Sequence, residues 1–98
     1  MNVIILQPAL DDFLAVGAYF DGVSERLAAR FRRCVEKTIE AILDFPKLSA
    51  AIRKGYRLRP IVRFRKYGIL YRIQQGIIFV HGVCYLGRGP QFWRTRLR

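Results

Sequence analysis

The sequence predicts an α+β fold in which a helical hairpin packs on a mainly antiparallel four-stranded sheet, in the order β-α-α-β-β-β. Two observations predict it. Apolar residues recur at steps of three and four between about residues 8 and 44, whereas after Pro46 they alternate with polar residues. A chain of 98 residues suits one domain and leaves no room for a second, so we expect a single domain over residues 1–98.

The first 44 residues predict one strand and two helices. The β-branched apolar run at residues 3–6 predicts a buried strand. Pro8 suits the first turn of a helix, which should end at the turn signal of residues 21–22. A second helix is expected over residues 24–44 and should stop before Pro46, because the residue before a proline disfavours the helical conformation. The short connection between the helices predicts an antiparallel hairpin.

The second half predicts three strands and a tail. Residues 56–60 alternate, and Pro60 places that strand at an edge or at a strand end. Residues 67–73 alternate clearly, residues 74–76 form a turn, and the apolar run at 77–84 predicts a central strand. Glycine and proline in residues 86–98 predict a basic C-terminal tail without regular structure.

Charge is distributed unevenly along the chain. The net charge is +11, yet all seven acidic residues lie in the first 44 positions and Asp44 is the last of them. The basic residues that follow have no acidic partner in their own half. One interpretation is a solvated basic face that confers solubility. We favour the other interpretation, in which this surface binds an acidic partner.

Several classes of protein do not match the sequence. Cys34 and Cys84 form no metal-binding pattern and resemble buried apolar residues, so we expect no metal and no cofactor. The N-terminal segment lacks the basic region of a signal peptide, and no apolar run is long enough to span a membrane. We therefore expect a cytoplasmic protein without a membrane partner.

Several stretches, in this order, resemble the ParE/RelE superfamily of bacterial type II toxin–antitoxin toxins. The resemblance is carried by residues 7–14, by Tyr19, by residues 39–46 (IEAILDFP), by the strand pair GYRLR (55–59) and YGILYRI (67–73), and by IIFVH (77–81). It covers nearly the whole chain and implies the α+β fold of that superfamily.

The superfamily has two branches, and the resemblance is closer to ParE. ParE-like toxins inhibit DNA gyrase and growth, stabilise plasmids, and are neutralised by a cognate acidic antitoxin. RelE-like toxins are ribosome-dependent mRNA endoribonucleases that use basic residues on the sheet. This chain has Gly68 where RelE-like toxins commonly carry an arginine, and it departs from the usual pattern after His81. The ParE-like interpretation therefore assigns no catalytic residue. The RelE-like alternative assigns catalysis to Arg57, Arg59, Tyr85 and Arg88.

On the ParE-like interpretation, basic residues of the second half, together with one tryptophan, bind the antitoxin or the target. The candidates are Arg57, Arg59, Arg63, Arg65, Lys66, Arg72, Arg88, Trp93 and Arg94. A third alternative is a small nucleic-acid-binding module, in which these cations would act with Tyr56, Tyr67, Tyr71 and Tyr85. Alternation predicts that His81 projects with Ile77, Phe79 and Val83 as a core or sheet-edge histidine rather than a general base.

Overall fold

The computed structural model describes residues 2–87 and confirms the predicted order of elements. Each predicted boundary lies within a few residues of the observed one. The elements are β1 (Asn2–Ile5), α1 (Gln7–Asp21), α2 (Glu25–Asp44), β2 (Tyr56–Ile61), β3 (Phe64–Gln74) and β4 (Ile77–Tyr85).

The four strands form one sheet in the order β1-β4-β3-β2. The pairs β2–β3 and β3–β4 are antiparallel, and β1 joins the far side of β4 as a parallel strand, with Val3 opposite Ile78. The sheet is thus mainly antiparallel, as predicted. Its β4 is a central strand, and β2, which contains Pro60, is an edge strand.

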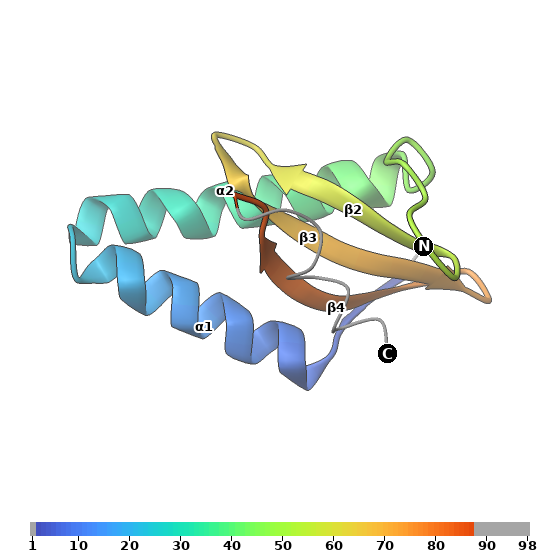
Figure 1. The fold of residues 1–98 in the computed structure, drawn as a ribbon, viewed down its shortest axis with the longest axis horizontal. Helices are drawn as coiled ribbons and strands as arrows, with labels where there is room; N and C mark the ends of the chain where they lie inside the picture. The colour runs from blue at the N-terminus through green and yellow to red at the C-terminus, as the bar shows by residue number, and fades with distance from the viewer. Residues whose placement is uncertain (1, 88–98) are drawn as a thin grey trace.

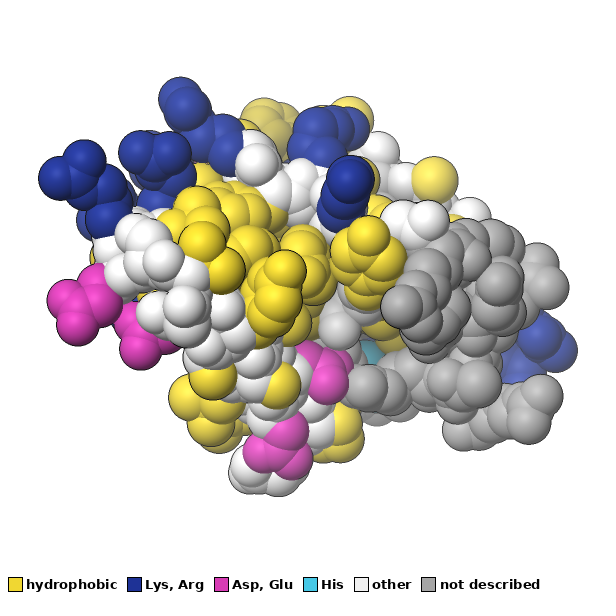
Figure 2. All heavy atoms as spheres, turned by 60° about the vertical axis from the view of Figure 1, so that its left-hand side comes forward, with side chains coloured by type: hydrophobic (Ala, Val, Ile, Leu, Met, Phe, Trp, Pro, Cys, Tyr) yellow, Lys and Arg dark blue, Asp and Glu magenta, His cyan; other side chains and the backbone are white. Residues whose placement is uncertain are grey.

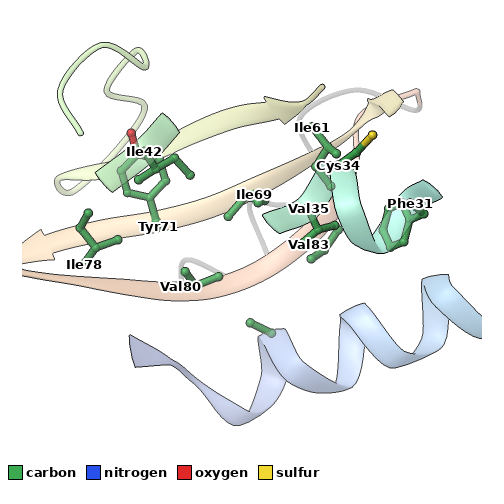
Figure 3. Close-up of a cluster of buried hydrophobic side chains, with 11 residues drawn as sticks. Phe31, Cys34, Val35, Ile42, Ile61, Ile69, Tyr71, Ile78, Val80 and Val83 are labelled. Atoms are coloured by element: carbon green, nitrogen blue, oxygen red, sulfur yellow. The ribbon is translucent and has the colours of Figure 1, made fainter. Parts of the chain in front are cut away.

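The two helices form an antiparallel hairpin on one side of the sheet, with α1 against β4 and α2 against β2 (Figure 1). The Ser24 hydroxyl caps α2 by accepting a hydrogen bond from the Leu27 N–H at 3.2 Å. The apolar stripe of α2 then faces the strands. Figure 3 shows the resulting core, to which α1 contributes Ala9, α2 contributes Phe31, Cys34, Val35 and Ile42, and the strands contribute Ile61, Ile69, Tyr71, Ile78, Val80 and Val83.

Aromatic rings join the hairpin to the sheet at one end of this core. Phe20 of α1 and Phe31 of α2 both contact the rings of Phe64 and Tyr67 on β3, at centroid distances of 5.1 to 6.1 Å. All four contacts are edge-on, with interplanar angles of 64° to 82°, which is a favoured geometry for aromatic pairs. The cluster therefore fixes the position of the helical hairpin relative to β3.

The opposite face of the sheet carries a second, smaller cluster. Successive strand residues point to opposite faces, so Leu70 lies on the other side from Ile69 and Tyr71. It packs with Cys84, and Ile52, Tyr56, Leu58 and Leu86 surround the pair. Both cysteines are buried and free, as predicted, and they belong to different clusters.

A bulge in β4 changes the side to which its last residues point. Val80 is opposite Tyr71 and Gly82 is opposite Leu70, which leaves His81 as the extra residue. The His81 ring contacts the Tyr56 ring at 4.9 Å, whereas Val83 enters the core beneath the helices. The prediction that Val83 projects with His81 is therefore wrong, because alternation does not continue through a bulge.

A side chain of α1 continues the hydrogen bonding where β1 ends. The pairing of β1 with β4 stops at Ile5 and Val80, and the Leu6 N–H still reaches the Val80 carbonyl at 3.0 Å. Further along β4, Asp12 Oδ2 accepts a hydrogen bond from the Val83 N–H at 3.0 Å. The Asp12 carboxylate thus takes the place of the backbone carbonyl that a longer β1 would have offered to this N–H.

We expect Asp12→Ala to lower the free energy of unfolding by about 1–3 kcal/mol, because it removes a charged acceptor from a partly buried N–H. Asp11→Ala is the matched control, since exposed Asp11 bonds the neighbouring Gln7 side chain on the same helix. Urea unfolding of both variants measures the difference. Equal losses in the two variants would show that the Asp12–Val83 bond contributes nothing particular to stability.

Candidate functional site

Arg57 and Arg59 point toward the helices rather than toward the other face of the sheet. They pair across the sheet with Tyr71 and Ile69, whose side chains lie in the core beneath the helices. The Arg57 guanidinium donates hydrogen bonds to the Ser49 carbonyl at 2.6 Å and to the Lys47 carbonyl at 3.3 Å. It therefore contacts the loop that follows α2.

Arg59 binds the same loop. Its Nε donates to the Ser49 hydroxyl, and its Nη2 donates to the carbonyl of Phe45, the C-cap residue of α2, at 3.0 Å. The Tyr71 hydroxyl donates to the neighbouring Pro46 carbonyl at 2.6 Å. A helix C-terminus carries partial negative charge on its free carbonyls, so two guanidinium groups stabilise this end of α2. Binding roles for Arg57 and Arg59 stay predictions, and both side chains already have partners within the fold.

The β2–β3 turn and the start of β3 present three cations to solvent. Arg63, Arg65 and Lys66 are exposed. All three line a pocket of about 440 Å³, which we call the aromatic pocket; its other lining residues are Tyr19, Phe20, Phe64, Tyr67 and Tyr85. Burial raises the pKa of Tyr67, and the nearby Tyr19 and Tyr85 hydroxyls raise it further. Tyr67 therefore remains a neutral hydrogen-bonding group at physiological pH.

Of the other predicted binding residues, only Arg72 is described by the structure. Arg72 is on the second face of the sheet, with its guanidinium carbon 5.4 Å from the centroid of the Tyr56 ring. Arg88, Trp93 and Arg94 fall outside the described residues 2–87. The six predicted binding residues that lie within residues 2–87 thus do not form one surface. The structure brings Arg63, Arg65 and Lys66 together, and it places Arg57 and Arg59 at the end of α2.

The alternative catalytic set is also divided. Tyr85 lies in the aromatic pocket with Arg65 and Lys66, and neither Arg57 nor Arg59 lines that pocket. Gly68 is closely packed, because a Cβ atom there would be 3.1 Å from Leu86 Cδ1 and 3.2 Å from Leu58 Cδ1. A larger residue at this position would require both leucine side chains to shift.

The tyrosines of the nucleic-acid-binding alternative have different environments. Tyr71 is 0% exposed and its hydroxyl bonds the Pro46 carbonyl, so it is a core residue that cannot stack on a base. Tyr56 contacts His81 and Arg72, whereas Tyr67 and Tyr85 contact each other at 5.3 Å in the aromatic pocket. Two of the four therefore share a pocket with cations.

An apolar groove runs between the helices. It has a volume of about 350 Å³ and combines apolar walls with a few charged residues, and it is lined by Ile5, Phe13, Leu14, Gly17, Ala18, Asp21, Phe31, Arg32, Val35, Glu36 and Ile39. Leu14 is 65% exposed beside it. On the face seen in Figure 2, exposed hydrophobic side chains gather between Lys and Arg side chains on one side and acidic side chains on the other. Exposed apolar area of this kind is typical of a protein-binding surface.

Sequence reasoning missed a cationic cluster on α2. Arg30, Arg33 and Lys37 line a pocket of about 260 Å³ together with Arg63 and Cys34, and we call it the cationic pocket. The signal was present in the sequence, because steps of three and four place residues 30, 33 and 37 on one face of a helix. The missing information was that the β2–β3 turn would meet that face.

Residues 3–83 match the family described as ParE toxin of type II toxin-antitoxin system, parDE. The chain belongs to this toxin family. The match confirms the resemblance inferred from the sequence, and it identifies the protein as a toxin that has a cognate antitoxin as its partner. The toxin matches none of the curated proteins with which it was compared.

Two further findings apply to the described part of the toxin. Neither helix in residues 2–87 has both the length and the apolar character that crossing a membrane requires. Within the same residues, no group of three or more His, Cys, Asp or Glu side chains could hold a metal ion.

We expect Arg59→Gln to lower the free energy of unfolding by about 1–3 kcal/mol, because it removes charged hydrogen bonds to the end of α2. Arg59→Lys should restore little of the loss, since an ammonium group lacks the planar fork that reaches two acceptors. Arg65→Gln, an exposed arginine on the next strand, is the control. Thermal unfolding compares the three variants. Full stability in Arg59→Gln would mean that the loop holds α2 without this contact.

Proposed function

We propose that this toxin inhibits DNA gyrase by binding it, without catalysis, and that its antitoxin relieves the inhibition by covering the toxin. The family match over residues 3–83 carries the proposal, together with the closer resemblance to the ParE-like branch. The leucines packed over Gly68 support it, because they occupy the place where RelE-like toxins commonly have an arginine. The position of Tyr85 also supports the proposal, because Tyr85 lies in the aromatic pocket and neither Arg57 nor Arg59 lines that pocket.

The exposed cations of the β2–β3 turn are the part of the site best placed to contact a large target. Arg65 and Lys66 border the aromatic pocket and are exposed. A border of cations around tyrosine and phenylalanine rings suits a protein interface, where aromatic residues and arginine contribute most of the binding energy. We therefore assign target contact to Arg63, Arg65 and Lys66 before the other predicted cations.

Purified toxin should inhibit gyrase supercoiling, and Arg65→Gln/Lys66→Gln should weaken the inhibition at least about tenfold. Arg32→Gln/Arg53→Gln removes the same charge elsewhere and should leave the inhibition unchanged. Supercoiling of a relaxed plasmid at increasing toxin concentration is the measurement. Unaffected gyrase at excess toxin, with growth still arrested in cells, would mean that the target is wrong.

The same purified toxin can be tested as a ribonuclease. Toeprinting on translated messages would reveal cleavage at the ribosomal A site. Cleavage that Tyr85→Phe abolishes would favour the RelE-like alternative, and an unchanged message would favour the gyrase proposal.

For the antitoxin, we assign the apolar groove between α1 and α2 as the docking site. Its apolar walls suit the apolar side of an amphipathic segment, and the +11 charge of the toxin favours an acidic partner. An antitoxin segment that is both apolar on one side and acidic elsewhere would therefore use the groove and the surrounding cations together. Such a segment can order as it binds.

We expect Leu14→Ser to weaken binding of the cognate antitoxin at least about tenfold, because it removes an apolar contact at the groove. Stability should hardly change, since Leu14 is 65% exposed. Leu48→Ser is the matched control, because Leu48 is 76% exposed on the loop after α2 and lies outside the groove. Calorimetric titration with the antitoxin compares the variants. Equal effects of the two substitutions would place the antitoxin elsewhere.

A further inference from the structure

The cationic pocket is held in shape by a buried threonine. The Thr38 hydroxyl donates a hydrogen bond to the Cys34 carbonyl at 2.7 Å and accepts one from the Val62 N–H at 3.1 Å. Thr38 is only 3% exposed, and the neighbouring Ile61 is fully buried. The β2–β3 turn is therefore fastened to α2, and Arg63 is placed beside Arg30, Arg33 and Lys37.

Arg63 adopts a backbone conformation that is unusual for an arginine. Its φ is 65°, in the left-handed region, where glycine and asparagine are the common residues of a tight turn. An arginine here costs stability relative to either of them. Strained residues of this kind concentrate at functional sites. The side chain of Arg63 is thus the feature of the turn that calls for a functional explanation.

The lining of the pocket determines the chemistry of its ligand. Its charged residues are four cations and no acid, and the pocket has about 260 Å³ of space. One arginine fork can satisfy a carboxylate, which has two oxygens. Three arginines and a lysine around one space offer many more donors than a single carboxylate accepts. Phosphate groups, with more acceptor oxygens and more charge, match this set better.

The cations also continue beyond the pocket. Arg63 lines both the cationic pocket and the aromatic pocket, so Arg65 and Lys66 extend the positive surface from α2 onto β3. Along α2, residues 30, 33 and 37 lie at successive turns of the helix, which rises 5.4 Å per turn. A ligand with repeated phosphates would engage this extended surface, whereas a single phosphate would occupy only the pocket.

We propose that the cationic pocket binds backbone phosphates of a nucleic acid, with Arg30, Arg33, Lys37 and Arg63 as the contacting residues. Contacts of this kind are independent of base sequence. The pocket shares Arg63 with the surface to which we assign target contact, but the two proposals are tested separately, because nucleic acid binding is measured without gyrase. It also differs from the tyrosine-based alternative considered from the sequence, since its cations come mainly from α2.

The test is fluorescence anisotropy of a labelled DNA duplex at several salt concentrations. The full-length toxin should bind with an affinity that falls steeply as salt rises. Arg33→Gln/Arg63→Asn should weaken binding at low salt at least about tenfold and lower the salt slope by about two, one for each lost phosphate contact. Asn suits the left-handed position, so this variant should stay folded in thermal unfolding.

Lys47→Gln/Arg53→Gln is the matched control. It removes the same charge, but both residues are exposed in the segment between α2 and β2, and neither lines the cationic pocket, the aromatic pocket or the apolar groove. Its salt slope should remain that of the unmodified toxin. Equal losses in the two double variants would overturn the proposal, as would the absence of DNA binding at low salt. The proposal would also be overturned if the toxin bound an acidic peptide but not DNA, and if Arg33→Gln/Arg63→Asn weakened that peptide binding. The ligand of the pocket would then be a carboxylate.

Discussion

The packing of α2 on β2, β3 and β4 is the interaction on which the rest of the structure depends. Phe31 and Ile42, about three turns apart on the helix, are almost completely buried against strand residues that are themselves inaccessible to solvent, such as Ile69 and Tyr71. Hydrophobic burial of this kind is the main favourable term in folding. Because the helix is held on the sheet from Phe31 to Ile42, polar contacts at its C-terminal end and near its middle become possible.

Those polar contacts place the charged residues. At the C-terminal end of α2, Arg57 and Arg59 bind carbonyl and hydroxyl groups of the following loop. Nearer its middle, Thr38 fastens the β2–β3 turn. The contacts with the loop give Arg57 and Arg59 partners within the fold. The Thr38 contact brings Arg63 beside the cations of α2. A chain with a basic second half thus acquires one structural pair of arginines and one exposed cationic surface.

The three surfaces to which we assign binding roles are chemically distinct. The groove between the helices is mostly apolar, the aromatic pocket combines rings with Arg65 and Lys66, and the cationic pocket has charged walls of one sign. Arg63 belongs to the last two. On our proposals, an antitoxin, a protein target and a polyanion would be recognised by largely different side chains, with Arg63 shared by the last two. The net charge of the chain therefore does not by itself indicate the role of each basic residue.

Local signals in the sequence determined the elements of this protein. Pro8, Ser24 and Pro46 mark helix ends, residues 75–76 form the β3–β4 turn, and the run at 77–84, which is apolar except for His81, forms a central strand. Ordered motifs determined the family. Only the tertiary structure decided the parallel pairing of β1 with β4, the bulge that separates His81 from Val83, and the partners of the arginines. These features depend on contacts between residues far apart in the chain, such as Thr38 with Val62 and Asp12 with Val83, which periodicity cannot encode.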